Sequence, residues 1–121
     1  MLLTLLKSKI HRATVTEANP NYIGSITIDR NLMNAAGILE YEQVHVADVD
    51  NAARLVTYVI AGEPGSGTIC LNGAAAQLVN PSDKVIIMAY CQIEDVAAKG
   101  FFPAVVFVDG QNKICGKKNV N

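Results

Sequence analysis

Short segments in which apolar and polar residues alternate make up most of this chain, which is the pattern of β-strands with one buried face. The clearest is 54–61, where a period of two places Arg54 and Tyr58 on one face and Thr57 on the other. The same alternation, or a short apolar run, predicts further strands at residues 2–6, 9–17, 25–28, 43–49, 68–71, 85–90 and 103–108.

Helical signals are few and short. Asp29 is placed to cap a helix over residues 30–36, and Gly37 is placed to end it. Residues 74–78 are predicted to form one or two helical turns. Neither segment is long enough for the crossover that joins parallel strands in a βαβ unit, so the strand spacing favours a small closed β-barrel.

No linker or repeat interrupts the 121 residues, so we predict a single domain over residues 1–121. Asp109-Gly110 follows the last predicted strand and is a hairpin signal. The polar tail, residues 117–121, is expected to be disordered.

Composition narrows the classes of function. Half of the residues are hydrophobic and only 17% are charged. So few polar residues would leave apolar surface exposed on a monomer of this size, which favours a homo-oligomer. Ten basic against eleven acidic residues give no electrostatic case for nucleic acid. The longest apolar run, residues 85–91, is far too short to span a membrane, so we expect a soluble protein.

The three cysteines, Cys70, Cys91 and Cys115, form no CxxC motif and cannot all pair within one chain. This usage is typical of thiols in a reducing compartment and predicts a cytoplasmic protein. Because His11 and His45 are the only histidines, a His/Cys metal site has little support, and we expect no metal.

The dipeptide Gly24-Ser25 separates two segments that are both predicted as strands. Such a dipeptide is most often only a turn. A serine at this point has a second use, because its hydroxyl lies within reach of the preceding carbonyl. Attack on the Gly24 carbonyl would exchange the amide for an ester, and elimination across Ser25 would then break the chain. The dipeptide by itself leaves both interpretations open.

Polar residues suited to chemistry lie on two predicted strands. Arg54 and Tyr58 are four positions apart, about 13 Å along a strand. Arginine suits bidentate carboxylate binding, and a tyrosine hydroxyl can donate a proton in a site that excludes water. Spacing alone, however, favours purely structural positions, with Arg54 at the surface of the sheet and Tyr58 at the edge of the core. Thr57 faces the other side, toward a neighbouring subunit or the bond discussed above. Lys9 and His11 share a strand face, and such residues near an N-terminus are most often solvated.

The segment Asn72-Gly73-Ala74-Ala75-Ala76 leads into predicted helical turns. In one interpretation it is only the turn that enters them. In the other, small side chains leave backbone N–H groups exposed at a helix start, where an anion can bind. Spacing does not decide between the two.

Taken together, four segments closely resemble the bacterial, pyruvoyl-dependent aspartate 1-decarboxylase family of pantothenate (coenzyme A) synthesis. They are KIHRATVT at 9–16, YIGSITID at 22–29, AAGI at 35–38 and NGAAA at 72–76. Arg54, Thr57-Tyr58 and Gly65-Ser66 also fall in the family's order and spacing, and the resemblance runs from about residue 1 to residue 109. Each segment alone is weak, whereas the ordered set is highly specific.

The resemblance implies a mainly β fold, a double-psi β-barrel with short helices, assembled as a homotetramer with active sites between subunits. It also implies that Ser25 is a site of self-processing. An N→O acyl shift and β-elimination would leave residues 1–24 as a β-chain ending at Gly24, and residues 25–121 as an α-chain that starts with a pyruvoyl group. It leaves open whether another protein assists this cleavage. Ser82-Asp83, where such barrels often have Gly-Asp, is a minor departure.

The reaction that the resemblance implies is decarboxylation of L-aspartate to β-alanine and CO2. A Schiff base between the substrate amine and the pyruvoyl ketone would serve as the electron sink, the part that pyridoxal phosphate plays in other enzymes. No pyridoxal phosphate and no metal are implied.

Roles for individual residues follow from the resemblance as well. Ser25 is the precursor of the pyruvoyl group, and Tyr58 is the proton donor to the product carbanion. Arg54 is a clamp for a substrate carboxylate. The full set of implied substrate-binding residues is Arg54, Thr57, Asn72, Gly73, Ala74, Ala75, Lys9, His11 and Tyr22.

Two alternatives to this function stay open. A fold does not fix a function, so the chain could be a non-catalytic double-psi barrel, a binding module that keeps its Gly24–Ser25 bond intact. Within the enzymes, it could be a pyruvoyl-dependent decarboxylase of another acidic amino acid.

Overall fold

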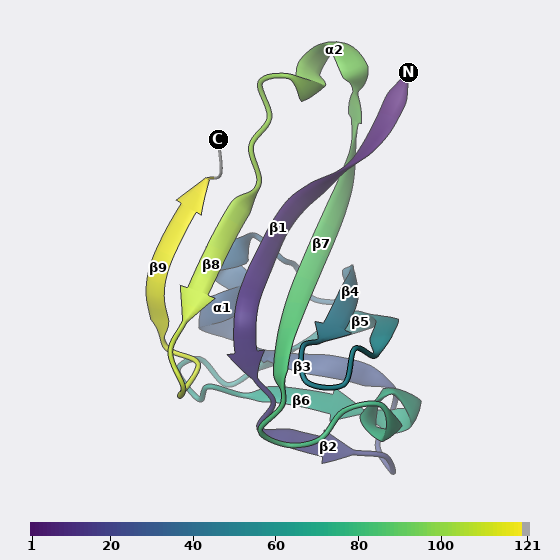
Figure 1. The fold of residues 1–121 in the computed structure, drawn as a ribbon, viewed down its shortest axis with the longest axis vertical. Helices are drawn as coiled ribbons and strands as arrows, with labels where there is room; N and C mark the ends of the chain where they lie inside the picture. The colour runs from purple at the N-terminus through teal and green to yellow at the C-terminus, as the bar shows by residue number, and fades with distance from the viewer. Residues whose placement is uncertain (120–121) are drawn as a thin grey trace.

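A computed structural model of the chain describes residues 1–119. Its strands are β1 (Leu2–Thr14), β2 (Glu17–Asn19), β3 (Ser25–Asp29), β4 (Gln43–Asp48), β5 (Arg54–Gly62), β6 (Ile69–Asn72), β7 (Lys84–Glu94), β8 (Ala104–Val108) and β9 (Ile114–Asn119). Its helices are α1 (Arg30–Ala36), the 3₁₀ helix η1 (Gly73–Gln77) and α2 (Asp95–Ala98) (Figure 1). The predicted mainly β class with short helices is confirmed.

The strands pair in the order β2-β6-β3-β5-β4-β7-β1-β8-β9. Most neighbours are antiparallel, but β2 and β6, β3 and β5, and β1 and β8 are parallel. Thr16 lies between β1 and β2, and its N–H donates to the carbonyl of Ile69 in β6 (2.8 Å). The segment that joins β1 to β2 is therefore bonded to β6, which brings the two parts of the strand order together. This arrangement is consistent with the double-psi type. Full closure of the barrel stays a prediction.

Alternate side chains of the central strands form the core. Ile26 and Ile28 of β3 are completely buried, as are Val44 of β4, Val59 of β5 and Ile87 of β7. The residues between them point outward and are half-buried or exposed, which is the alternation from which the strands were predicted.

The predicted helix over residues 30–36 is confirmed, with its caps. The Asp29 carboxylate accepts from the Asn31 N–H (2.8 Å), and Gly37 takes the left-handed conformation (φ 67°) with its N–H bonded to the last turn. Burial by itself raises the pKa of Asp29, but hydrogen bonds from the N–H groups of Gly67, Asn31 and Gly65 lower it overall. Asp29 therefore joins the helix start to the loop before β6. Among residues 1–119, no helix is both long and apolar enough to cross a membrane.

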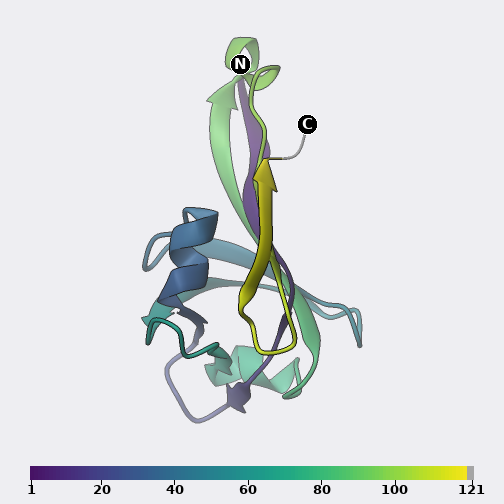
Figure 2. The same ribbon diagram turned by 90° about the vertical axis from the view of Figure 1, so that its left-hand side faces the viewer.

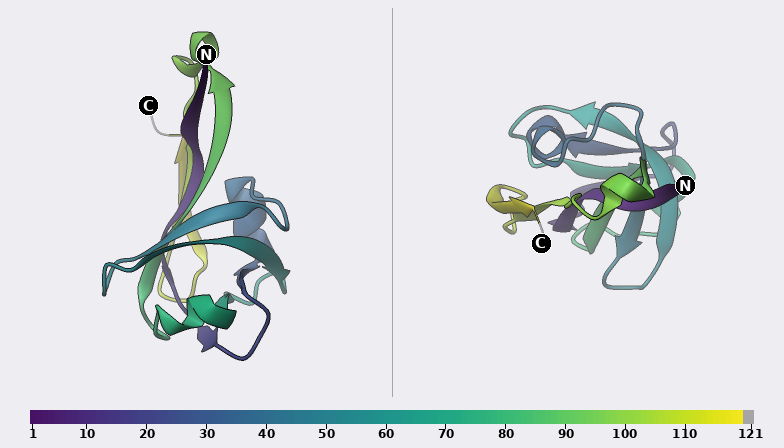
Figure 3. Two further views of the ribbon diagram at one scale, coloured as in Figure 1. Left: turned by 90° about the vertical axis from the view of Figure 1, so that its right-hand side faces the viewer. Right: turned by 90° about the horizontal axis from the view of Figure 1, so that it is seen from above.

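A two-stranded ribbon made of β1 and β7 rises out of the barrel region (Figure 2). The left view in Figure 3 shows α2 at its tip, close to the N-terminus. The Met1 ammonium is hydrogen-bonded to the Glu94 carboxylate (2.8 Å). Leu2, Leu3 and Val96 are exposed near this tip, so the ribbon presents apolar side chains to the solvent.

The structure corrects the boundaries of the first strands. We predicted separate strands at 2–6 and 9–17, whereas one strand, β1, continues to Thr14. Its register against β7 shifts between Leu6 and Ser8 and again after Ile10, and these bulges interrupt the period of two along the sequence. Arg12, inside the second shift, has a φ of 60°.

The structure also corrects the C-terminal tail. We predicted disorder over residues 117–121, but residues 117–119 belong to β9, which pairs antiparallel with β8 and places Lys117 opposite Val106. Backbone pairing at a sheet edge does not require apolar side chains, and polar composition therefore misled the prediction. Residues 120–121 lie outside the described residues. The hairpin predicted at Asp109-Gly110 is confirmed by the turn that joins β8 to β9.

Candidate active site

Ser25 is the first residue of β3, at the junction between an exposed loop and the buried centre of the sheet. Its side chain is 1% exposed, whereas Gly24 before it is exposed. On one side β3 runs antiparallel to β6, which places Ser25 opposite Asn72. On the other side β3 runs parallel to β5 with Ile26 opposite Val59, so the same register sets Tyr58 beside Ser25.

Asn72 organises the polar groups around Ser25. Its side-chain Nδ2 donates to the Ser25 Oγ (2.9 Å) and to the Thr27 Oγ1 (3.1 Å), and its Oδ1 accepts from the Cys70 thiol (3.2 Å). The Ser25 hydroxyl in turn donates to the Ile23 carbonyl (3.4 Å). Ser25 and Asn72 are both buried, so these bonds form away from bulk water.

Gly73 follows Asn72 and packs its backbone against Gly24. Its φ is +68°, and a Cβ at this position would lie 2.6 Å from the Gly24 Cα and 2.8 Å from the Gly24 nitrogen. Only glycine allows this approach, so Gly73 fixes the backbone at the junction with Ser25. In η1, which follows, Ala74 is exposed and Ala75 is half-buried.

Two pockets flank Ser25. The first, of about 230 Å³, has mostly apolar and aromatic walls and is lined by Tyr22, Ile23, Ser25, Tyr41, Tyr58 and Ile60. The second, of about 260 Å³, lies on the β6 side and is lined by Glu17, Asn19, Tyr22, Thr27, Thr68, Cys70 and Asn72. Tyr22 is shared by both pockets.

Lys9 and Arg54 lie on the exposed side of β5, β4, β7 and β1, which we call the outer sheet face. Tyr58 is on the same face of β5 as Arg54, four residues along the strand. Lys9 is opposite Met88 of β7, and Arg54 is opposite Ala47 of β4. Lys9 is level with Val56 across the sheet, so three strand spacings and two residues of strand length separate it from Arg54 by about 16 Å. Neither residue lines either pocket beside Ser25.

His11 also lies on β1, where its ring packs edge-on against Phe107 with the ring centroids 5.7 Å apart. Burial lowers the pKa of His11, and the charges of Lys9 and Arg12 lower it further, so the ring is neutral at pH 7. Its Nδ1 is buried without a hydrogen-bond partner among the described residues. His11 therefore offers a neutral imidazole.

The structure brings together only part of the predicted site. Ser25, Gly24, Tyr22, Tyr58, Asn72 and Gly73 lie around one junction, with Ala74 and Ala75 in the turn that follows. Thr57 is half-buried on the opposite face of β5 from Tyr58. Lys9, His11 and Arg54 are not brought to this junction within one copy of the chain.

Three residues at the junction were missed in the sequence. Cys70 and Thr27 lie two positions from Asn72 and Ser25 on their strands, so a period of two places each pair on one face. That signal was present once the strands were assigned. Tyr41 gave no comparable signal, because it reaches the pocket from the loop before β4.

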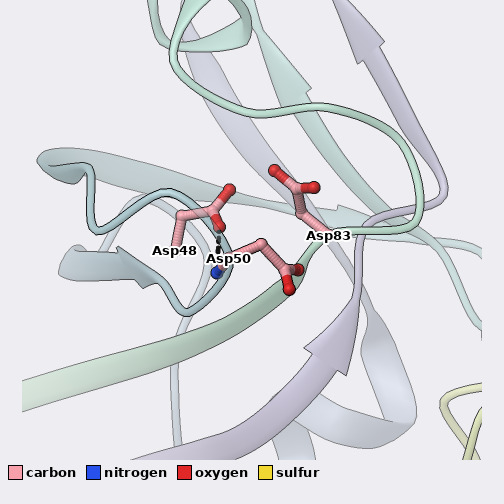
Figure 4. Close-up of side chains that lie close together, drawn as sticks. All are labelled: Asp48, Asp50 and Asp83. Carbon is pink, nitrogen blue, oxygen red and sulfur yellow. Dashed lines mark hydrogen bonds between the residues drawn. The ribbon is translucent and has the colours of Figure 1, made fainter.

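A cluster of acidic residues lies apart from Ser25, where β4 ends and β7 begins. Asp48, Asp50 and Asp83 each have a carboxylate oxygen within 4.8 Å of the others (Figure 4). Burial raises the pKa of Asp48, and the neighbouring Asp83 carboxylate raises it further. The neighbouring Asp48 carboxyl, and then the hydrogen bond from the Asn80 N–H, lower the pKa of Asp83. Of the two carboxyls, Asp48 is therefore the one that keeps its proton to the higher pH.

Comparisons with known proteins agree over nearly the whole chain. A family model described as aspartate decarboxylase matches residues 1–115. The aspartate 1-decarboxylase of Clostridium botulinum is 63% identical over 114 residues, which cover 94% of this chain and 90% of that protein. The enzyme of the same name from Clostridium kluyveri is 64% identical over the same shares. That of Caldicellulosiruptor saccharolyticus is 64% identical over 98% of this chain and 93% of its own.

Among solved structures, the computationally designed msDPBB_sym2 protein overlaps with 72% of this chain and 99% of its own length. The TM-score is 0.45 and the sequence identity is 17%.

Proposed function

This chain belongs to the aspartate decarboxylase family, and from that premise we propose that it converts L-aspartate to β-alanine and CO2 with a pyruvoyl group made from its own Ser25. The activity is that of a carboxy-lyase, and its product β-alanine supplies pantothenate synthesis. The observation that carries the self-processing is the buried Ser25 hydroxyl, which Asn72 holds at 2.9 Å beside the exposed Gly24.

Self-processing begins with attack of the Ser25 Oγ on the carbonyl carbon of Gly24. The C–N bond breaks as the C–O ester bond forms, and the hydroxyl proton passes to the freed amine. Loss of the Ser25 α-proton then breaks the Cβ–O bond and releases Gly24 as a carboxylate. Water replaces the nitrogen of the resulting dehydroalanine, ammonia leaves, and a ketone remains at residue 25. The close approach of Gly73 supports this proposal, because it holds the backbone under attack.

The surroundings of Ser25 suit a small neutral ketone. The walls of the pocket are aromatic and aliphatic, and the Asn72 Nδ2 is a donor that a ketone oxygen can use. When present, a pyruvoyl group supplies the electron sink for the carbanion that CO2 leaves behind. Tyr58 lines the same pocket, so its hydroxyl is the proton donor to the product carbon.

A second copy of the chain completes the site in this proposal. The pocket beside Ser25 has no cationic residue in its lining, whereas aspartate brings two carboxylates. We assign their binding to Arg54, with Lys9 and neutral His11 as further donors, on the outer sheet face of a neighbouring subunit in a homotetramer. Thr57 contacts substrate and assists cleavage, and Asn72 with the backbone of Gly73, Ala74 and Ala75 cradles the substrate.

Intact-mass spectrometry tests the self-processing. We expect the chain, 12.9 kDa as translated, to separate into residues 1–24 and residues 25–121. Ser25→Ala removes the nucleophile, so it should remain a single chain without decarboxylase activity. Ser66→Ala, at an exposed loop serine, serves as the control and should be cleaved like the wild type. Cleavage or activity in Ser25→Ala would refute the mechanism.

Reductive trapping separates this function from its alternatives. Borohydride with aspartate should attach the substrate covalently to residue 25 of the cleaved protein. A non-catalytic barrel would acquire no label, because it would carry no reactive carbonyl. A decarboxylase of another acidic amino acid would be labelled, and it would act on glutamate more efficiently than on aspartate.

A cytoplasmic location, predicted from the cysteines, stays part of the proposal.

A further inference from the structure

The side chain of Cys70 is connected to Ser25 through a single residue. Its Sγ lies 3.2 Å from the Asn72 Oδ1, and the Asn72 Nδ2 lies 2.9 Å from the Ser25 Oγ. Cys70 is 7% exposed and Asn72 is 3% exposed, so both side chains are largely shielded from bulk water. We propose that Cys70 is a positioning residue for self-processing, which fixes the amide of Asn72 with its nitrogen toward Ser25; this inference rests on the proposed function.

The other neighbours of Asn72 do not fix the direction of its amide. Ser25 and Thr27 have hydroxyls, which either donate or accept, so they would satisfy the amide oxygen as well as the amide nitrogen. The Cys70 thiol differs, because S–H is a donor and sulfur is a weak acceptor. It therefore pairs with Oδ1 and leaves Nδ2 for the two hydroxyls. Burial, and then the charge of Glu17, raise the pKa of Cys70, which keeps the thiol protonated at neutral pH.

The direction of the amide determines how the Ser25 hydroxyl is held. With Nδ2 toward it, the Oγ accepts one hydrogen bond and its own proton points to the Ile23 carbonyl (3.4 Å). With the amide reversed, Ser25 would donate to Oδ1, and its proton and lone pairs would turn away from that arrangement. A ketone at residue 25 has no hydrogen to donate, so only the Nδ2 side of Asn72 can hydrogen-bond with it.

Substitutions at Cys70 separate hydrogen bonding from packing. Cys70→Ala removes the donor, frees the amide to reverse and should slow cleavage of freshly purified precursor about tenfold, the effect of one lost hydrogen bond. Cys70→Ser keeps nearly the size of the side chain, but its hydroxyl can accept as well as donate and no longer fixes the amide, so cleavage should again be several-fold slower than in the wild type. Cys91→Ala, at a half-buried thiol of β7, is the matched control and should cleave at the wild-type rate. The rates are measured by intact mass over time.

The outcomes are distinct. A wild-type rate in either Cys70→Ala or Cys70→Ser would overturn the inference, because an amide that is free to reverse would then support cleavage as well as one that the thiol fixes. In either case wild-type cleavage would leave the proposed function standing. An uncleaved wild type would instead overturn both.

A spectroscopic measurement applies even if Cys70→Ala folds poorly. In the double variant Cys91→Ala/Cys115→Ala, the S–H stretching band in the Raman spectrum comes from Cys70 alone. We expect this band at the lower frequency of a hydrogen-bonded thiol, and we expect it to rise when Asn72→Ala is added. A band that does not move would contradict the hydrogen bond and overturn the inference.

Discussion

Gly73 has the tightest backbone contact at the candidate site, and its need for glycine is a matter of sterics. We expect Gly73→Ala to destabilise the fold by about 2 kcal/mol, because a left-handed residue acquires a Cβ that would lie 2.6 Å from the Gly24 Cα. Gly73→Ala should also slow cleavage by displacing the Gly24 carbonyl that Ser25 attacks. Chemical denaturation and intact mass report the two effects.

Gly110→Ala is the control for that substitution, since Gly110 lies in a turn where a Cβ would have no neighbour within 4 Å. It should leave both stability and cleavage close to the wild type. If Gly73→Ala were cleaved at the wild-type rate, the contact between Gly73 and Gly24 would have no part in processing.

Individual residues also show where sequence reasoning succeeds. Asp29 and Gly37 were assigned as helix caps because capping depends on neighbours a few positions away. Cys70 was assigned only as a reduced thiol, because its contact with Asn72 matters only once β6 is known to lie beside β3. The spacing of residues along the chain does not reveal which strands are neighbours in the sheet.

At the scale of elements, the turn after β4 and the start of β7 bring Asp48 and Asp83 together. The pKa of Asp48 is raised, so between the ordinary pKa of an aspartate and the raised value the folded state holds a proton that the unfolded chain releases. The stability from this group is complete below the ordinary pKa of an aspartate and is lost as the pH rises through the raised value. Asp83 contributes with the opposite sign, since its pKa is lowered.

Asp48→Asn should remove this pH dependence. Its amide oxygen can still accept from the N–H of Asp50, and its nitrogen can donate to Asp83 without needing a proton from solution. We expect the variant to be more stable than the wild type by about 1 kcal/mol at pH 7, with the difference shrinking toward pH 4. Denaturation at several pH values measures this, with Asp95→Asn at the exposed ribbon tip as the control. A loss of stability at pH 7 would contradict the assignment.

Elements also explain which boundaries could not be predicted. The alternation in β5 is regular, and its faces came out as predicted. In β1 two register shifts break the alternation, so one strand has the sequence pattern of two. β9 is polar and pairs at an edge, where backbone bonds suffice.

At the scale of the whole molecule, Arg54 does not line the pockets beside Ser25 within one chain, and this leads to a complementation experiment. Ser25→Ala and Arg54→Ala should each be nearly inactive alone. Co-expressed, they should recover about a quarter of the wild-type activity, because some interfaces combine an intact Ser25 from one chain with an intact Arg54 from its neighbour. Co-expression of Ser25→Ala with wild type calibrates the mixing. No recovery would place the whole site within one chain.

The loop between β2 and β3 has a consequence for the life of the molecule after cleavage. Both strands pair with β6, and β1 is enclosed between β7 and β8, so a cut between Gly24 and Ser25 leaves the N-terminal piece held in the sheet. In the precursor, the bond between Gly24 and Ser25 keeps the two segments in one chain while they fold. The cut protein, once unfolded, has to bring two separate peptides together again, at a cost that depends on concentration. The precursor would therefore fold readily, whereas the cleaved protein, once unfolded, would refold less readily and in a concentration-dependent way.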